Sequence, residues 1–337
     1  MNNKELSSNK SGDERVLEQT LRPLSFSEYM GQETLKKNLN VLIEAAKKRN
    51  EPIEHILIHG PAGLGKTTLA HIITKEMSAQ MKITSGAALE KVGDIGSILT
   101  NLSEGDILFI DEVHRLNKLV EEILYPAMEN FKLDIIIGKG TSARTIQIDL
   151  PKFTLIAATT RISLLSAPFR SRFGVQCRLN FYDAGDIKRI IKRSASILGI
   201  NITTDAISII AEASRATPRV ANRLLKRVRD LAQVQDASTV DKKIAQTTLS
   251  MYEIDEIGLE STDRNILTAI LKQFKGGPVG LKTIAAAIAE EEDTVAEVYE
   301  PYLMQAGLIA RTPRGRVITL KALEHLKLRQ EDKNLLI

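Results

Sequence analysis

Short apolar runs alternate with longer amphipathic stretches through the first half of the chain. The runs of strand type lie at 56–59, 82–84, 107–110 and 154–158, and patterns with helical spacing lie between them. A short apolar run between turn residues favours a buried strand, whereas a period of 3.6 residues favours a helix. This alternation predicts a large α/β domain over residues 21–182, in which helices cover both faces of a parallel sheet.

A different pattern interrupts this alternation. Residues 133–140 and 144–150 form two β-rich arms around a Gly-containing turn, which predicts a hairpin inserted at 132–150. Ile146, Ile148 and Leu150 alternate along one face of the second arm. The insert either extends the sheet or docks a partner. Exposed strand edges are usually protected by charge, so the apolar arms favour a docking surface. Its predicted partner-binding residues are Ile135, Ile137, Ile146 and Ile148.

The second half of the chain has mainly helical spacing. Helices at 186–198, 205–214 and 218–233 predict a small helical lid domain over residues 183–255. In residues 256–337 we expect a helix that Ser261 caps, a second helix at 281–290 and a third whose capping box is Thr294 with Glu297. Two short arms, 308–312 and 316–319, then enclose a turn. This order predicts a winged-helix domain, and a helical bundle with a terminal hairpin is the alternative.

Composition narrows the class of protein. The chain has 337 residues, of which 43% are hydrophobic and 26% charged, as in soluble globular proteins. Its single cysteine, Cys177, excludes a disulfide framework and a Cys-rich zinc module. Residues 1–20 are polar and predict a disordered tail rather than a signal peptide. A single cysteine also fits a reducing cytosol, so we expect a cytoplasmic protein. No apolar run approaches the length that crosses a membrane, and we expect no membrane partner. The net charge of +4 argues only weakly for nucleic acid.

Residues 60–67, Gly-Pro-Ala-Gly-Leu-Gly-Lys-Thr, fill every fixed position of the phosphate-binding pattern GxxxxGK[ST]. Small residues allow successive backbone N–H groups to surround a polyphosphate, Lys66 reaches the β- and γ-phosphates, and the Thr67 hydroxyl can ligate Mg²⁺. An apolar strand precedes the loop and a helical pattern follows it, as this chemistry requires. The alternative is an ordinary Gly-rich turn. The pattern predicts a nucleoside triphosphate site.

A second element indicates hydrolysis. The apolar strand at 107–110 runs into Asp111 and Glu112. Asp111 is placed to hold Mg²⁺ through its water shell, and Glu112 to orient and polarise an attacking water. Taken alone, such a strand end could be merely solvated. His114, which follows, is interpreted as a structural or coupling residue.

The turn in the last pair of arms is basic. Arg311, Arg314 and Arg316 lie close together, and the nearest acids in the sequence are Glu300 and Glu324. Phosphate groups of DNA would satisfy these guanidiniums independently of base sequence, so we predict that they bind DNA. A solvated basic turn is the alternative.

Several motifs together resemble one family. They are Leu-Arg-Pro at 21–23, Glu-Tyr-Met-Gly-Gln at 28–32, the phosphate loop, Asp-Glu-Val-His-Arg-Leu at 111–116, Ala-Thr-Thr-Arg at 158–161, Ser-Arg-Phe-Gly at 171–174, Ala-Thr-Pro-Arg at 216–219 and Arg-Thr-Pro-Arg-Gly-Arg at 311–316. From about residue 20 to 330 the chain resembles the RuvB family of AAA+ motors, and the hairpin and the Arg-rich turn narrow the resemblance to that family. It implies an ATP- and Mg²⁺-dependent helicase that drives branch migration of Holliday junctions in recombination, repair and the SOS response to DNA damage. It also implies a hexameric ring that works on duplex DNA and four-way junctions, with a junction-binding protein resembling RuvA and a resolvase resembling RuvC.

The resemblance also implies roles for single residues. Leu21 and Arg22 would line the adenine pocket, and the phosphates and Mg²⁺ would be held by Gly63, Gly65, Lys66, Thr67 and Thr68. Thr160 would be the sensor of the γ-phosphate, with Thr159 as the alternative. Further nucleotide contacts would come from Glu129, Asn130, Phe131, Tyr182 and, as the lid sensor, Arg219. The chain departs from the family at Ala62, where Pro is frequent, and at Asn130, where Asp is usual.

Arg172 would be the arginine finger that reaches the site of the adjacent subunit. A guanidinium on the γ-phosphate stabilises the transition state of hydrolysis. Arg170 is the neighbouring candidate, and the resemblance favours Arg172.

Two other readings share parts of this pattern. A clamp-loader subunit has a similar ATPase core and a Ser-Arg finger, but a cysteine-poor chain with a predicted C-terminal winged helix argues against it. An ATP-switched DNA-binding initiator would also use a winged helix. The hairpin at 132–150 distinguishes a motor from an initiator, because a motor recruited by a partner needs a docking element and an initiator does not.

Overall fold

The computed structural model describes residues 19–137 and 144–326, although not the side chains of 135–137, 144 and 145. The chain divides into two compact units. The first contains residues up to Gly60 together with Leu64–Asn180, and the second contains Pro61–Gly63 together with the chain from Phe181 onward. Of the predicted N-terminal tail, residues 1–18 lie outside the described residues, and Gln19 and Thr20 are helical.

The first unit is built on a five-stranded parallel sheet with the strand order β2-β3-β6-β1-β7. The strands are β1 (Ile56–His59), β2 (Met81–Ser85), β3 (Ile107–Asp111), β6 (Thr154–Thr159) and β7 (Val175–Arg178). The four predicted strands are confirmed. The fifth, β7, escaped prediction because it is an edge strand in which only Cys177 is buried, so it lacks the continuous apolar run of a central strand. Burial raises the pKa of the Cys177 thiol to about 12, which makes it inert.

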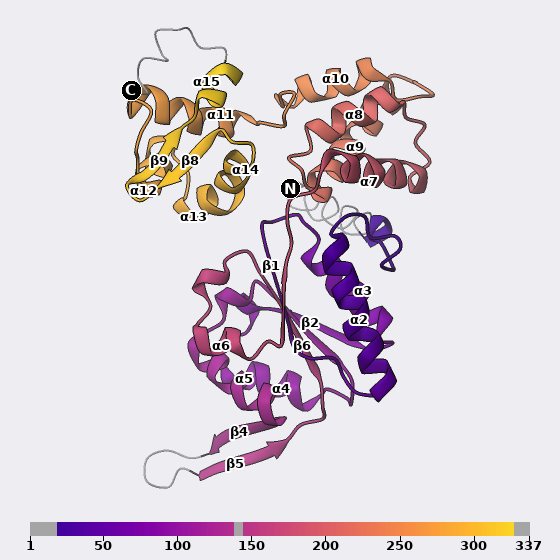
Figure 1. Cartoon of the computed structure of the whole chain (residues 1–337), viewed down its shortest axis with the longest axis vertical. Coiled ribbons are helices and arrows are strands. Elements are labelled where there is room, and N and C mark those ends of the chain that lie inside the picture. The colour runs from indigo at the N-terminus through magenta and orange to yellow at the C-terminus, as the bar shows by residue number, and fades with distance from the viewer. Residues whose placement is uncertain (1–18, 138–143, 327–337) are drawn as a thin grey trace, which may run out of the picture. The chain divides into compact units, whose positions relative to one another are not determined.

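Helices cover both faces of this sheet. Figure 1 shows α2 (Glu33–Arg49) and α3 (Lys66–Glu76) on one face, and α4 (Val92–Thr100), α5 (Lys118–Asn130) and α6 (Ala167–Ser171) on the other. Short 3₁₀ turns, η1 (Gly86–Ala88), η2 (Val113–Arg115) and η4 (Ile162–Leu164), connect them. The apolar sides of α4, α5 and α6 pack on β3 and β6 around Phe153 and Phe169, which are almost completely buried. The sheet therefore presents the ends of its central strands from a rigid, well-packed layer.

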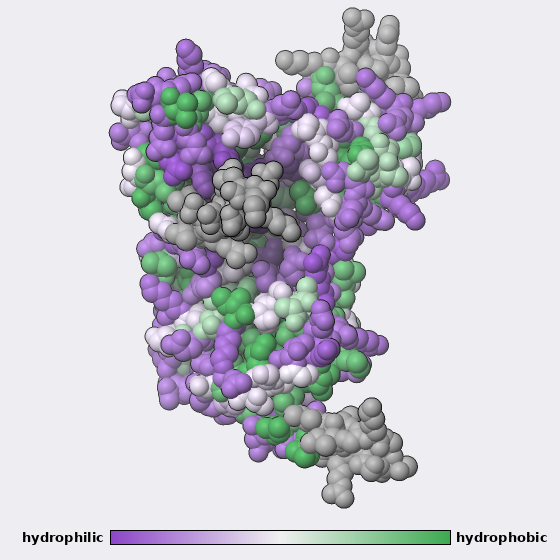
Figure 2. Space-filling view, turned by 180° about the vertical axis from the view of Figure 1, so that it is seen from behind, coloured by the Kyte–Doolittle hydropathy of each residue, from purple (hydrophilic) through white to green (hydrophobic). Residues whose placement is uncertain are grey.

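The inserted hairpin is confirmed as an antiparallel pair, β4 (Lys132–Ile137) and β5 (Arg144–Asp149). These two strands form a sheet of their own, separate from the five-stranded sheet, and β4 begins directly after the C-terminus of α5. Exposure rises along one face of the second arm. Leu150, directly after β5, is buried, Ile148 packs against the core, and Ile146 is 48% exposed. The expectation that Ile148 is exposed is therefore wrong. Figure 2 shows hydrophobic surface on this hairpin beside the segment drawn in grey.

The second unit begins with four helices, α7 (Ala184–Ile197), α8 (Thr204–Glu212), α9 (Pro218–Val234) and α10 (Lys242–Met251). Each helix has a side-chain N-cap, in which Asp183, Thr203, Thr217 or Asp241 accepts a hydrogen bond from the backbone N–H three residues later. Three of the helices were predicted. The fourth, α10, was missed, although Asp241 before an amphipathic run is a helix-start signal.

The remainder of the second unit packs around one apolar core. Its elements are α11 (Ser261–Thr268), the π-helical segment η5 (Ala269–Gln273), α12 (Leu281–Ala287), α13 (Glu292–Thr294), the π-helical segment η6 (Val295–Tyr299), α14 (Glu300–Gln305), β8 (Ile309–Thr312), β9 (Gly315–Ile318) and α15 (Leu320–His325). Strands β8 and β9 form the wing, and Val279 adds a bridge to Arg316. The domain is a winged helix.

Two predicted caps are wrong. The N-cap of α11 is Glu260, which forms a capping box with Asp263, so Ser261 is already the first helical residue. Thr294 has helical backbone angles and does not begin a helix, since that turn starts after Glu291. At α11 the Asp263 carboxylate accepts from the backbone N–H of Glu260, so a carboxylate takes the place that the prediction gave to a hydroxyl. None of the described helices is long and apolar enough to span a membrane.

Candidate functional site

The phosphate loop connects β1 to α3, as predicted. Gly63 and Gly65 have φ angles of 79° and 94°, in the left-handed region that favours glycine. At Gly60 a Cβ atom would lie 2.5 Å from the carbonyl oxygen of Leu179, so no larger residue fits. Lys66 is the first residue of α3, and its Nζ donates to the carbonyl oxygen of Gly60 at 2.8 Å. The lysine thus lies across the loop, where it can meet phosphate charge.

The predicted metal ligands face each other. Asp111 ends β3, and its Oδ2 accepts a long hydrogen bond from the Thr67 hydroxyl, with 3.5 Å between the oxygens. Its other oxygen, Oδ1, accepts from the backbone N–H of Glu112 at 2.9 Å. A hydroxyl and a carboxylate fit Mg²⁺, which takes oxygen ligands and keeps several waters. Within the described residues there is no cluster of three or more His, Cys, Asp or Glu side chains that would form an all-protein metal cage.

Glu112 has an unusual backbone. Its φ and ψ of 49° and 44° lie in the left-handed region, and its carbonyl oxygen packs so closely on Gly86 that a Cβ there would come within 2.4 Å. Its carboxylate forms an ion pair with Arg115 at 3.3 Å, on side chains that are 39% and 59% exposed. A non-glycine residue held in this region marks a position that its surroundings constrain. The strand end therefore turns sharply at the residue predicted as the catalytic base.

The end of β6 lies beside this turn. Thr159 is buried, and its Oγ1 contacts His114 Nδ1 and accepts from the backbone N–H of Arg161, both at 2.9 Å. These two contacts engage the Thr159 hydroxyl. The interpretation of His114 as a structural residue agrees with this contact.

Two other histidines lie near the loop and are neutral at pH 7. The pKa of His71 is lowered to about 4 by burial and by the nearby charge of Arg22. Burial, Arg178 and Lys66 lower the pKa of His59. Leu21, predicted with Arg22 for the adenine pocket, is buried. Tyr29, which sequence reasoning assigned to no site, is also buried, and its hydroxyl would lie 3.5 Å from a Cβ at Gly65.

Arg172 follows the short helix α6, and its guanidinium is held in a defined position. It lies 4.1 Å over the ring of Tyr125, donates to the carbonyl oxygen of Pro168 at 2.6 Å, and its Nε is 3.2 Å from Glu129. The last contact is an ion pair rather than an aligned hydrogen bond, because Nε has no hydrogen-bond partner in the described residues. None of these contacts joins Arg172 to the phosphate loop. Tyr125 is a further residue that sequence reasoning missed.

The residues next to Glu129 differ in environment. Asn130 is exposed at the end of α5. Phe131 is partly buried against the core, with its ring 5.9 Å from that of Phe153 and 6.4 Å from that of His55. Phe131 therefore packs against the core, whereas the family resemblance implies a contact with the nucleotide.

In the second unit the predicted lid residues lie around one turn. Arg219 is exposed near the start of α9, and its backbone N–H approaches the carbonyl oxygen of Gly63 at 3.4 Å. Tyr182 is buried, and its N–H donates to the carbonyl oxygen of Ala216 at 3.0 Å.

The wing arginines do not share one environment. Arg311 and Arg314 are exposed and form no ion pair within the described residues. Arg316 instead makes a bidentate ion pair with Glu300, at 2.6 and 3.0 Å, on side chains that are 13% and 9% exposed. The premise that all three guanidiniums lack an acidic partner is therefore wrong for Arg316. Glu300 is distant from the wing in sequence but lies close to it in the structure, because α14 packs beside β8 in the same core.

The fold and this site define a P-loop ATPase with a helical lid and a winged-helix domain. Three family models match successive parts of the chain: the P-loop domain of the Holliday junction DNA helicase RuvB at residues 21–179, the RuvB AAA lid domain at 182–255 and the RuvB C-terminal winged-helix domain at 256–327. The chain belongs to the RuvB family, and it is an AAA+ ATP hydrolase.

Solved structures agree. A Thermotoga maritima RuvB, described as a Holliday junction branch migration motor, is 51% identical, with a TM-score of 0.85 over 92% of this chain and 99% of that one. Two single-residue mutants of the Thermotoga protein match over the same shares at 50% identity, with TM-scores of 0.85 and 0.86.

Proposed function

We propose that this chain is an ATP-driven ring motor that moves duplex DNA and so drives branch migration of Holliday junctions in recombination and DNA repair. One observation carries the proposal: a single chain of the RuvB family combines a phosphate loop, whose Thr67 faces Asp111, with a winged-helix domain of the RuvB type. A clamp loader or an initiator is not favoured, since all three matched domains belong to RuvB.

ATP and Mg²⁺ are the proposed cofactors. Lys66 and the loop glycines hold the phosphates, while Thr67 and Asp111 hold Mg²⁺, which neutralises phosphate charge when it is bound. Glu112 orients the attacking water and takes its proton. To do so, its carboxylate has to leave Arg115, and breaking such an exposed pair costs at most about 1 kcal/mol. Thr160 senses the γ-phosphate, and Leu21, Arg22, Tyr182 and Arg219 complete the nucleotide contacts.

We place Arg172 in trans, at the nucleotide of an adjacent subunit in a hexameric ring. The support is its environment: the Tyr125 ring, the Pro168 carbonyl and Glu129 hold the guanidinium in one orientation, and its contacts are with α5 and α6 rather than with its own phosphate loop. A finger held in this way has little side-chain entropy left to lose when a neighbour docks. Glu129 and Asn130, on the same stretch of α5, are assigned to that interface, and Phe131 to packing beneath it.

Contact with duplex DNA is assigned to Arg311 and Arg314. Both are exposed on the wing, and phosphate contacts from a hairpin tip are independent of base sequence, as a motor on arbitrary DNA requires. Arg316 serves this surface indirectly, because its pair with Glu300 attaches the wing to α14.

The hairpin of β4 and β5 is the proposed docking site for a junction-binding protein resembling RuvA, with a resolvase resembling RuvC acting on the same junction. Ile146→Asp should abolish partner binding, because it places a charge in an apolar contact, and should leave basal ATPase unchanged. Val41→Asp on α2, which is 69% exposed, is the matched control. Ile148 is avoided because it packs on the core. A parallel loss of ATPase in Ile146→Asp would assign the hairpin to the fold instead.

The proposed boundaries between the ATPase domain, the lid and the winged-helix domain lie at residues 182 and 255. The proposed site of action is the cytoplasm, during the SOS response to DNA damage. The deciding experiment is strand exchange on a synthetic four-way junction, with ATP and Mg²⁺, with and without the junction-binding partner. We expect ATP-dependent conversion that the partner accelerates. Binding of DNA with ATP but no conversion under any condition would favour a nucleotide-switched DNA-binding protein.

A further inference from the structure

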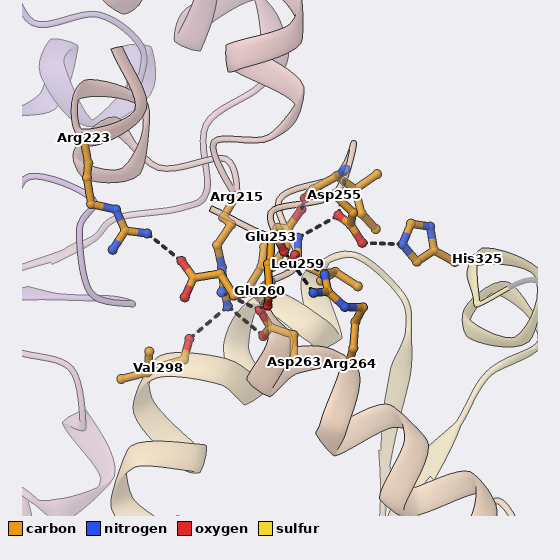
Figure 3. A network of polar contacts seen from close by, with 12 residues as sticks. Arg215, Arg223, Glu253, Asp255, Leu259, Glu260, Asp263, Arg264, Val298 and His325 are labelled. Atoms are coloured by element: carbon orange, nitrogen blue, oxygen red, sulfur yellow. Dashed lines mark hydrogen bonds and ion pairs between the residues drawn. The ribbon is translucent and has the colours of Figure 1, made fainter. Parts of the chain in front are cut away.

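A buried side chain of the lid, Arg215, reaches the winged-helix domain. Arg215 lies just before α9, and its guanidinium makes two hydrogen bonds to Asp263 of α11, at 2.8 and 3.2 Å. The two side chains are 8% and 0% exposed. Figure 3 shows this pair at the centre of a polar network between the two domains.

Three elements of the winged-helix domain enclose the guanidinium. Besides Asp263 on α11, the carbonyl oxygen of Val298 in η6 accepts from Nη2 at 3.3 Å, and the ring of Tyr302 on α14 lies 4.7 Å from the guanidinium carbon. The Tyr302 hydroxyl is in turn bonded to the carbonyl oxygen of Ile257, at the start of the domain. A planar group held by a carboxylate, a carbonyl and a ring face can take only one position.

The backbone at this point is also constrained. Arg215 and Ala216 have φ angles of 55° and 53°, so two successive non-glycine residues are left-handed, which is costly unless their surroundings enforce it. At Gly258, where the chain enters the winged-helix domain, a Cβ would lie 2.3 Å from the carbonyl oxygen of Ala213. The link between the domains therefore passes in direct contact with the segment that carries Arg215.

Stability alone does not explain such a pair. Burial raises the pKa of Asp263, and the nearby charge of Arg215 and the N–H of Glu260 only oppose that shift. Replacing a buried ion pair by neutral groups is frequently neutral for stability, so a buried pair is better explained by the position that it defines. A second ion pair between the domains, Arg223 with Glu260, has side chains that are 53% and 36% exposed, and such a pair constrains little.

Arg219, the proposed nucleotide sensor of the lid, lies four positions after Arg215 in the sequence. We infer that the Arg215–Asp263 pair is a rigid joint which holds the winged-helix domain to the segment carrying Arg219, so that the two domains move as one body and the work of ATP hydrolysis reaches DNA. The inference rests on the proposed function, because it assumes that the winged-helix domain moves DNA. Arg215 and Asp263 act on position and touch neither nucleotide nor DNA.

The test uses the full chain with Arg215→Met and Asp263→Asn combined, which removes both charges and leaves an amide oxygen to accept from Glu260. Arg215→Lys keeps the charge but loses the fork, and Arg223→Met is the matched control. Spin labels at Val234→Cys and Leu320→Cys, which replace exposed residues of the two domains, report the distance between them. Cys177 is fully buried and does not compete for label.

We expect a narrow distance distribution in the parent and in Arg223→Met, and a broad one in the double variant and in Arg215→Lys. On a four-way junction, the double variant should hydrolyse ATP without DNA and bind duplex as the parent does. Its ATP consumption per junction converted should rise about tenfold, as expected when a coupling free energy between two sites is removed. Equal distance widths in the parent and both joint variants would overturn the inference. So would an unchanged ATP cost in a folded double variant. A parent that converts no junctions would contradict the proposed function instead, and the distance measurement would still decide on the joint.

Discussion

The nucleotide end of the sheet and the wing both carry charged residues that are close in sequence, but the two regions use them differently. At the sheet, Lys66, Asp111 and Glu112 are placed by backbone, namely the glycine loop, a strand end and a left-handed turn. In the wing, Arg311 and Arg316 stand opposite each other in register, yet one is exposed and the other is paired with Glu300. Where the backbone defines the geometry, a sequence motif is enough to predict the role of a charged residue. Elsewhere the role depends on which distant side chain lies nearby.

The largest effect should come from Arg172→Ala. This variant tests whether the nucleotide site at the end of the sheet also needs an arginine for hydrolysis. We expect normal ATP binding and a loss of turnover on the order of 10³- to 10⁵-fold, since the guanidinium stabilises charge in the transition state. The measurement is steady-state ATPase together with nucleotide affinity.

Mixing decides whether Arg172 acts in trans. Rings that combine Arg172→Ala with Lys66→Ala chains should regain part of the activity, at interfaces that keep both groups. If mixed rings form and no ratio restores hydrolysis, the finger does not act on a neighbour.

Glu112→Gln should come next. We expect ATP binding close to that of the parent and turnover lowered by about 10²- to 10⁴-fold, because the amide cannot take a proton from water. Lys66→Ala, by contrast, should lose nucleotide affinity. Near-normal turnover in Glu112→Gln would show that the strand-end carboxylate is not the base.

In the wing, Arg316→Ala should act on stability. It leaves the buried Glu300 carboxylate unpaired, which typically costs about 3–5 kcal/mol in the free energy of unfolding. Arg311→Ala, on the opposite strand, should change it by less than about 0.5 kcal/mol. Chemical denaturation of the two variants measures the difference directly. Equal stabilities would mean that the two arginines are equivalent after all.

The smallest effect should come from Arg311→Ala with Arg314→Ala. Binding to unrelated duplexes should weaken about equally, and the slope of log affinity against log salt should fall by about 0.9 for each DNA phosphate that the protein no longer neutralises. ATPase without DNA should not change. An unaltered affinity and salt slope would remove the wing from the DNA path.

The sequence by itself determined the parallel sheet, the phosphate loop, the strand-end acids, the lid and the winged helix. These depend on local signals, such as the length of apolar runs, glycine at left-handed positions and a hydroxyl or carboxylate before a helix. It failed at β7, where an edge strand has only one buried residue, and at the caps of α11 and α13, where several polar residues compete for one role.

Only the tertiary structure decided which charges pair. Asp263 lies 48 residues after Arg215 and Glu300 lies 16 residues before Arg316, and neither separation indicates contact. The position of Arg172 over the Tyr125 ring, and the partial burial of Ile148 and Phe131, likewise depend on how separate elements pack. The physical reason is that a backbone conformation is specified by neighbours in sequence, whereas the partner of a long charged side chain is specified by whatever the fold brings within a few ångströms of its tip.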